Sequence, residues 1–134
     1  MADDEVLRHD QSDYTPNPGS VGLARRRAAR LAEEWGYAQL ADATALLTSE
    51  LATNAVLHGS VRGRLFRVRL ALTADLLRIA VEDAKGEATP RPRHPGPEEP
   101  HGRGLHLVRA LASRWGTDHR SVGKTVWCEL DLPG

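Results

Sequence analysis

The sequence predicts an α/β (α+β) two-layer sandwich, in which helices cover one face of a mixed, mainly antiparallel β-sheet. Three observations support this fold class. Two stretches in the first half repeat apolar residues at the helical period, and two later stretches alternate apolar and polar residues as strands do. The length of 134 residues fits one domain with a hydrophobic core of its own.

The composition argues against several classes of protein. Lys plus Arg and Asp plus Glu both number 18, so bulk electrostatic attraction to nucleic acid or anionic lipid is not expected. Cys128 is the only cysteine, which rules out an internal disulfide and fits a reducing compartment. No segment has the pattern of a signal peptide or a membrane span. We therefore expect a cytoplasmic protein with no direct nucleic-acid partner and no membrane partner.

The N-terminal third is expected to be an arm followed by a helix. Residues 1–19 are polar and interrupted by prolines, so they are predicted as a flexible arm with an edge strand near Tyr14. Ser20 is the expected N-cap of a first helix whose apolar stripe ends at Trp35. Its exposed side is either a partner-binding face or a solvated one, and it carries four arginines: Arg25, Arg26, Arg27 and Arg30.

A second helix is predicted from about residue 39 to residue 58, with Gly59 as its C-terminal stop. Glu50 and Asn54 lie one turn apart on this helix. A helical wheel places Glu50 at the edge of the apolar stripe and Asn54 within it. A buried carboxylate must be paired, protonated or hydrated, so this pair indicates a wet polar pocket. An Asn oxygen there suits Mg²⁺, and a carboxylate can orient or deprotonate a hydroxyl. A structural polar pair that caps a neighbouring element is the alternative.

Alternating apolar residues at 66–72 and 77–81 predict a β-hairpin across a turn at 73–75. Asp83 continues the apolar phase of the second strand. Because side chains alternate along a strand, the Asp83 carboxylate should project to the buried face at the strand's C-terminal end.

Residues 84–101 hold five of the eight prolines and are predicted as a long lid-like loop. The loop ends in Gly102-Arg103-Gly104-Leu105, where a third helix should begin. Glycines at a helix N-terminus let backbone N–H groups approach phosphate oxygens, although a flexible hinge explains them equally well.

The third helix is expected to run to Trp115 and to end at Gly116, before a closing hairpin. The last strand should bury four side chains: Val126, Cys128, Leu130 and Leu132. Gly123-Lys124-Thr125 is not the end of a Walker A loop, because a strand follows it instead of a helix. The six histidines match no metal-ligand spacing.

Taken in order, these features resemble the GHKL superfamily of ATP-binding domains, which includes gyrase and the histidine kinases. Residues 50–59 look like its N box, Asp83 stands where the family places an adenine-binding carboxylate, and residues 102–105 look like its second glycine box. The small size and the segments 114–116 and 123–127 most resemble the anti-sigma-factor serine/threonine kinase branch of actinobacterial regulator type.

The resemblance covers residues 20–134 and implies a Bergerat-type fold that binds ATP and Mg²⁺. Asn54 would coordinate Mg²⁺ on the ATP phosphates, Glu50 would act as general base or orient the attacking hydroxyl, and Asp83 would recognise adenine. The lid would span about residues 84–101. Further nucleotide contacts would come from Gly86, Gly102, Arg103, Gly104, Leu105 and Thr125.

The implied function is an anti-sigma-factor serine/threonine protein kinase. Its partners would be an anti-sigma-factor antagonist of the STAS-like class and a sigma factor, and the family also admits a homodimer. The alternative is a nucleotide-gated protein-binding regulator without significant kinase activity. Two departures from the family pattern favour that alternative: a displaced glycine, Gly86, after Asp83, and Lys124 where a Thr often stands.

Overall fold

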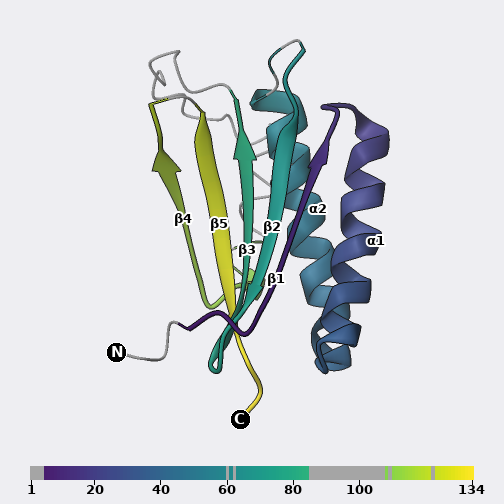
Figure 1. Ribbon diagram of the computed structural model, residues 1–134, viewed down its shortest axis with the longest axis vertical. Coiled ribbons are helices and arrows are strands. Elements are labelled where there is room, and N and C mark those ends of the chain that lie inside the picture. The colour runs from purple at the N-terminus through teal and green to yellow at the C-terminus, as the bar shows by residue number, and fades with distance from the viewer. Residues whose placement is uncertain (1–4, 60, 62, 85–107, 109, 122) are drawn as a thin grey trace.

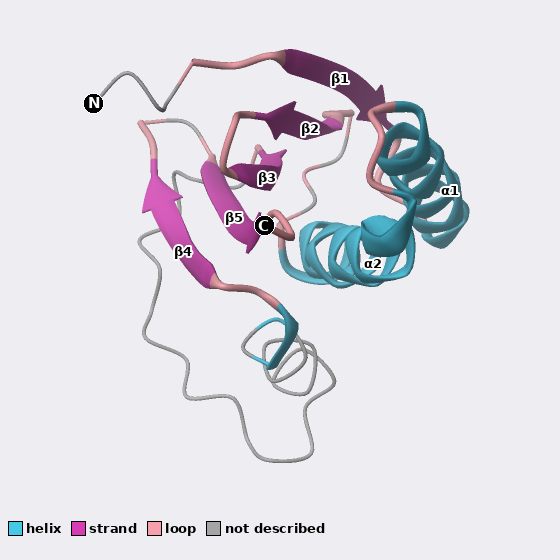
Figure 2. Ribbon diagram, turned by 90° about the horizontal axis from the view of Figure 1, so that it is seen from below, coloured by secondary structure: helices cyan, strands magenta, loops and turns pink. Residues whose placement is uncertain are grey.

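A five-stranded antiparallel sheet is covered on one face by two long helices (Figures 1 and 2). The computed structural model describes residues 5–59, 61, 63–84, 108, 110–121 and 123–134. The sheet order is β1-β2-β3-β5-β4, and every described pair of strands is antiparallel. The predicted layers are thus confirmed, without the expected parallel component among the described strands. The elements are β1 (Arg8–Tyr14), α1 (Pro18–Glu34), the 3₁₀ turn η2 (Ala38–Leu40), α2 (Ala41–His58), β2 (Phe66–Leu72), β3 (Leu76–Asp83), β4 (Arg114–His119) and β5 (Lys124–Asp131).

The N-terminal edge of the sheet is strand β1, which lies within the predicted flexible arm. Its sequence shows no apolar alternation, so contacts with other elements account for its order. The Asp10 carboxylate accepts hydrogen bonds from Arg27 Nε and Nη2 of α1 at 2.8 and 2.6 Å. These bonds hold the pKa of Asp10 below its ordinary value. Tyr14 stacks on Phe66 of β2 with ring centroids 5.5 Å apart.

Helix α1 begins three residues earlier than predicted, and Ser20 is not its N-cap. Asn17 is the cap, because its side-chain oxygen accepts a hydrogen bond from the Ser20 backbone N–H at 3.0 Å. Pro18 occupies the first helical position, where the missing N–H costs nothing. The helix ends at the predicted place, with Trp35 as C-cap and Gly36 following in the left-handed region at φ +95°.

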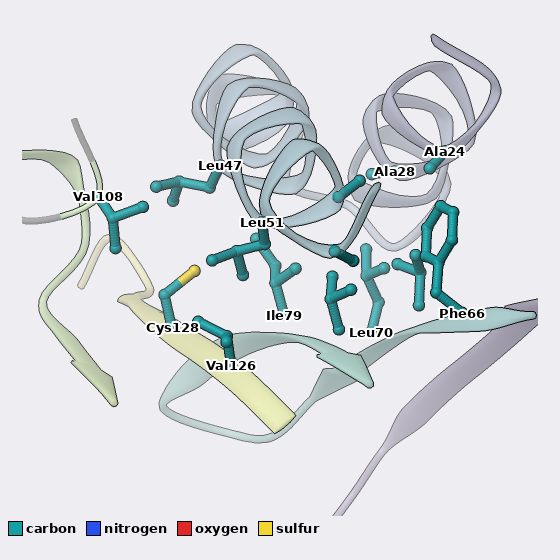
Figure 3. Close-up of a cluster of buried hydrophobic side chains, with 14 of the residues drawn as sticks. Ala24, Ala28, Leu47, Leu51, Phe66, Leu70, Ile79, Val108, Val126 and Cys128 are labelled. Carbon is teal, nitrogen blue, oxygen red and sulfur yellow. The ribbon is translucent and has the colours of Figure 1, made fainter. Parts of the chain in front are cut away.

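Helix α2 packs on β2, β3 and β5 and forms the centre of the core (Figure 3). Its Leu47 and Leu51 are fully buried and point toward the same region as Ile79 of β3 and Cys128 of β5. Small residues on the facing side of α1, such as Ala28, let the two helices approach closely. Contacts with both the sheet and α1 therefore fix the orientation of α2.

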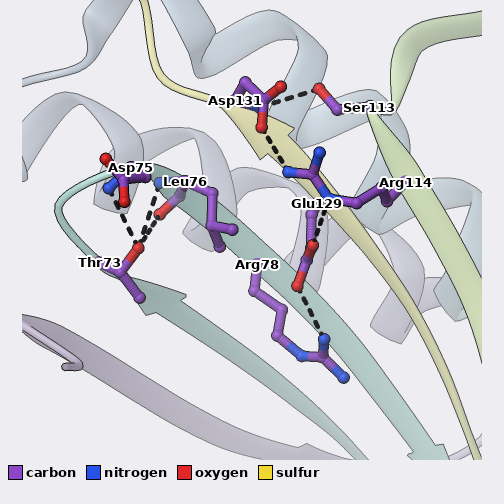
Figure 4. Close-up of polar contacts among 8 residues, drawn as sticks. All are labelled: Thr73, Asp75, Leu76, Arg78, Ser113, Arg114, Glu129 and Asp131. Atoms are coloured by element: carbon purple, nitrogen blue, oxygen red, sulfur yellow. Dashed lines mark hydrogen bonds and ion pairs between the residues drawn. The ribbon is translucent and has the colours of Figure 1, made fainter. Parts of the chain in front are cut away.

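The hairpin of β2 and β3 follows the prediction. Thr73 caps its turn: the Thr73 hydroxyl oxygen accepts hydrogen bonds from the backbone N–H groups of Asp75 and Leu76, both at 3.2 Å (Figure 4). Turn geometry sets the register, which pairs Val68 with Val81. The inward phase of β3 then continues through Asp83 at the strand end.

The predicted third helix does not extend to Trp115. The described helical residues end at Leu111, and Trp115 lies in β4, paired with Cys128 of β5. Gly116 is not a helix terminator either, because it lies in the strand beneath the Trp127 ring. A Cβ atom built on Gly116 would lie 2.7 Å from that ring. Pairing with β5 thus overrides a spacing that also fits a helix.

The sheet face that the helices leave uncovered carries charged side chains in ion pairs. Arg78 donates to Glu129 at 3.0 Å, and Arg114 donates to the other oxygen of Glu129 at 2.8 Å and also to Asp131 (Figure 4). The Arg78 guanidinium lies 4.4 Å from the centre of the Trp127 ring. This face of the sheet is therefore polar, and the buried apolar side chains lie on the face that packs against the helices.

Candidate functional site

The C-terminal ends of α2 and β3 meet at Gly59 and Asp83. Alternation along β3 directs Asp83 inward with Val81, and the Asp83 side chain is only 3% exposed. A Cβ atom on Gly59 would lie 2.1 Å from Asp83 Oδ2 and 2.3 Å from Cγ. Gly59 has an ordinary negative φ, so its missing side chain is needed for space and not for backbone conformation. The two residues form one close-packed contact between helix and sheet.

Strand β5 supplies a cation to this contact. Lys124 is the register partner of Asp83, and its Nζ lies 3.2 Å from Asp83 Oδ2. The preceding Gly123 has φ +87°, and a Cβ atom there would lie 1.9 Å from the Asp83 carbonyl oxygen. Only glycine combines that conformation with so close an approach. The Asp83 carboxylate is therefore held by Gly59 on one side and Lys124 on another.

Glu50 and Asn54 lie on α2, upstream of Gly59, and both are half-buried as predicted. Neither side chain makes a hydrogen bond or an ion pair with another residue in the part of the chain that the structure describes. A rise of 1.5 Å per residue places Asn54 about 8 Å and Glu50 about 14 Å along the helix from Gly59. Asn54 and Glu50 thus lie progressively farther along α2 from the contact between Gly59 and Asp83.

Thr125 is not brought together with these residues. It pairs with Glu82, and cross-strand partners share a sheet face, so it lies on the side away from the helices. On that side Glu82 forms ion pairs with Arg69 and Arg120, each at 3.2 Å. Almost all of the predicted lid lies outside the described residues. So do the remaining predicted nucleotide contacts, Gly86, Gly102, Arg103, Gly104 and Leu105.

Lys124 is the site residue that the sequence reasoning did not assign. The sequence shows it only as a departure from a family pattern, because its contact with Asp83 depends on the register of two strands that are 41 residues apart in the chain. A prediction of the β3–β5 pairing would have revealed it, since the buried phases of the two strands, Val81 and Val126, align when Asp83 faces Lys124.

The side-chain oxygens of Asn54 and Glu50 fit a metal ion whose other ligands are phosphates and water. Among the residues that the structure describes, no three His, Cys, Asp or Glu side chains cluster as a metal site. Asn54 and Glu50 can offer one amide and one carboxylate oxygen. Mg²⁺ is commonly bound in this way, through one or two protein oxygens with phosphates and water completing the octahedron.

The family is decided by comparison with known proteins. The model of the histidine kinase-like ATPase domain matches residues 14–129. The chain belongs to the histidine kinase-like ATPase domain family. The resemblance to this superfamily is thereby confirmed, and membership implies ATP binding. No curated protein matches the chain.

A solved structure agrees with this assignment at the level of fold. The histidine kinase-like ATPase domain is similar to the histidine kinase domain of a blue-light activated histidine kinase from Erythrobacter litoralis EL346, with 20% identity and a TM-score of 0.54. The match covers 84% of this chain and 61% of that one, so this chain spans about three fifths of the solved structure. Across the described residues, no helix is both long enough and apolar enough to cross a bilayer.

Proposed function

We propose that the chain is an ATP-dependent serine/threonine protein kinase of the anti-sigma-factor type. The observation that carries the proposal is the pair Glu50 and Asn54, half-buried one turn apart on the helix that ends against Asp83. No described residue forms a side-chain hydrogen bond or ion pair with either of them, so both polar groups are open to a ligand. A nucleotide lying along α2, with its base toward Asp83 and its phosphates toward Glu50, satisfies them.

Each residue then has one role. Asp83 accepts a hydrogen bond from the amino group of adenine, and Gly59 leaves room for the Asp83 carboxylate at the end of α2. Asn54 would hold Mg²⁺, which when bound would neutralise charge on the phosphates. Contacts to the nucleotide from elsewhere in the chain would involve Gly86, Gly102, Arg103, Gly104 and Leu105.

The transfer step requires one base. The Glu50 carboxylate accepts the proton of a substrate serine or threonine hydroxyl, whose oxygen forms a bond to the γ-phosphorus. The bond from that phosphorus to the β–γ bridging oxygen breaks, and ADP leaves with the electron pair. Phosphoryl transfer depends chiefly on positioning and charge stabilisation, so one oriented carboxylate and one metal ligand are sufficient side-chain machinery.

The proposed substrate is a serine or threonine of a STAS-like anti-sigma-factor antagonist, and the proposed second partner is a sigma factor. The test incubates the chain with labelled ATP, Mg²⁺ and the STAS-like proteins encoded in the same genome. We expect label on one of them, and transfer reduced by at least about 100-fold in Glu50→Gln, within the range for loss of a general base. Asp42→Asn is the matched control, because Asp42 is an exposed carboxylate in the first turn of the same helix.

The second candidate is a nucleotide-gated protein-binding regulator without kinase activity. The ion pair of Lys124 with Asp83 favours it, because that carboxylate has a partner before any nucleotide arrives. Calorimetry with ATP separates the two candidates. ATP binding that requires Asp83, combined with transfer that is absent or equal in wild type and Glu50→Gln, would reject the kinase and support the regulator.

A further inference from the structure

We propose that the outward face of α2 is the surface on which the protein substrate docks. The inference rests on the proposed kinase function and adds the chemistry of the segment that carries the serine or threonine. Leu46 and Leu57, which we call the outward leucines, lie on this face and are 38% and 55% exposed. Their separation in the chain corresponds to about three helical turns, so they lie in one row along the helix.

The outward face of α2 lacks the charges that a solvent-exposed helix face normally carries. Between residues 43 and 57 the only charged residue is Glu50. The outward face of α1 differs, because five of its exposed residues are charged: Arg25, Arg26, Arg30, Glu33 and Glu34. An exposed apolar row with so few charges is typical of an interaction surface.

Glu50 lies beside this row, between the outward leucines and the nucleotide side of the helix. Successive helical residues turn by about 100° around the axis, which places Glu50 about 20–40° and Asn54 about 60–80° from the outward leucines in the same direction. Leu47 and Leu51, which point toward β3 and β5, lie beyond Asn54 (Figure 3). A nucleotide along Asn54 and a substrate along the outward leucines would therefore meet at the Glu50 carboxylate.

These positions specify the substrate segment. At a rise of 1.5 Å per residue, Glu50 lies about 6 Å along the helix from Leu46 and about 10 Å from Leu57. An extended chain advances about 3.3 Å per residue, so its serine or threonine would stand about two positions from one apolar side chain and about three from the other. Charge complementarity requires that no acidic side chain lies next to this hydroxyl, because the Glu50 carboxylate would repel it. A membrane does not fit the row, because it would bury that carboxylate without a partner.

The experiment measures KM and kcat for phosphate transfer to the antagonist that wild type labels, at saturating ATP. Leu46→Gln combined with Leu57→Gln removes the apolar surface, and glutamine has nearly the helix propensity of leucine. We expect KM to rise at least about tenfold, since two leucine contacts are lost, and kcat and ATP affinity to change less than about twofold. Leu23→Gln is the matched control, because Leu23 is 54% exposed on α1.

Thermal unfolding checks that each variant is folded, and Leu46→Ala combined with Leu57→Ala replaces the glutamine variant if the latter is not. An unchanged KM in the folded double variant overturns the inference, as does a lower kcat at unchanged KM. Sedimentation in which the double variant loses a dimer that wild type forms also overturns it, because the row would then bind a second copy. These results leave the proposed function intact as long as transfer by wild type depends on Glu50. Absence of transfer by wild type overturns the proposed function and the docking surface together.

Discussion

Substitution of Gly59 by Ala tests whether the helix and the sheet meet as tightly as the structure indicates. The new methyl carbon would lie 2.1 Å from Asp83 Oδ2, 2.3 Å from Cγ and 2.7 Å from Cβ, whereas ordinary contacts begin at 3.4 Å. The groups must separate by more than 1 Å, and Asp83 is enclosed by Lys124. Overpacking of this kind costs about 1–3 kcal/mol, which we expect as a lower free energy of unfolding in urea.

The matched substitution is Gly22→Ala in the interior of α1. There the nearest atom is the mobile end of the Arg26 side chain at 3.3 Å, and alanine is the better helix former. We expect Gly22→Ala to raise stability by about 0.5–1 kcal/mol, so the same chemical change should have opposite signs at the two sites.

A double-mutant cycle isolates the cause. Asp83→Ala removes two of the three close atoms, Oδ2 and Cγ, but leaves Cβ at 2.7 Å. The cost of Gly59→Ala should therefore fall in the Asp83→Ala background without disappearing. A Gly59→Ala protein as stable as wild type, or a cost that is unchanged in the Asp83→Ala background, would refute the reasoning.

Three further predictions concern the core and the edge strand. Burial raises the pKa of Cys128 to about 12, so its thiol should resist alkylation at pH 8 in the folded protein and react on unfolding; rapid labelling of folded protein would contradict this. The folded pKa of Asp10 lies below its ordinary value of 3.8, so the contribution of the Asp10 carboxylate to stability is present above pH 4 and is lost as the pH falls through the folded pKa. As the pH falls from 4 through that pKa, the urea midpoint of Asp10→Asn should therefore fall less than that of wild type. Parallel curves for the two proteins would argue against the Arg27 contact. Leu47→Ala should cost about 2–5 kcal/mol by chemical denaturation, since Leu47 is fully buried, whereas exposed Leu46→Ala should cost much less; similar losses would contradict the orientation of α2.

Hydrophobic periodicity predicted the elements that carry the core. Leu47 and Leu51 repeat at helical spacing and Ile79 and Val81 at strand spacing, and each pattern matches the buried face observed. Periodicity failed at Trp115, because a residue four positions after Leu111 fits a helix and also fits a strand that pairs with β5. Local spacing carries no information about that pairing.

The candidate site was predictable only in part. Alternation along one strand was enough to direct Asp83 inward. The opposing position of Lys124 depends on the register between two strands, and the role of Gly59 depends on its distance from the Asp83 side chain. Gly59 was expected as a helix terminator, and its C-cap position confirms this, but the space it leaves for Asp83 is a tertiary feature. Contacts of this kind follow from assembly of the layers.

Isothermal titration of ATP with Mg²⁺ into wild type and Asp83→Ala tests the central claim most directly. Asp75→Ala is the control, because Asp75 is an exposed carboxylate beside the other end of β3. The account predicts that wild type and Asp75→Ala bind ATP alike and that Asp83→Ala binds at least about tenfold more weakly, the loss expected when a buried hydrogen-bond acceptor is removed. Equal affinity of all three proteins, or no binding by wild type, would contradict it.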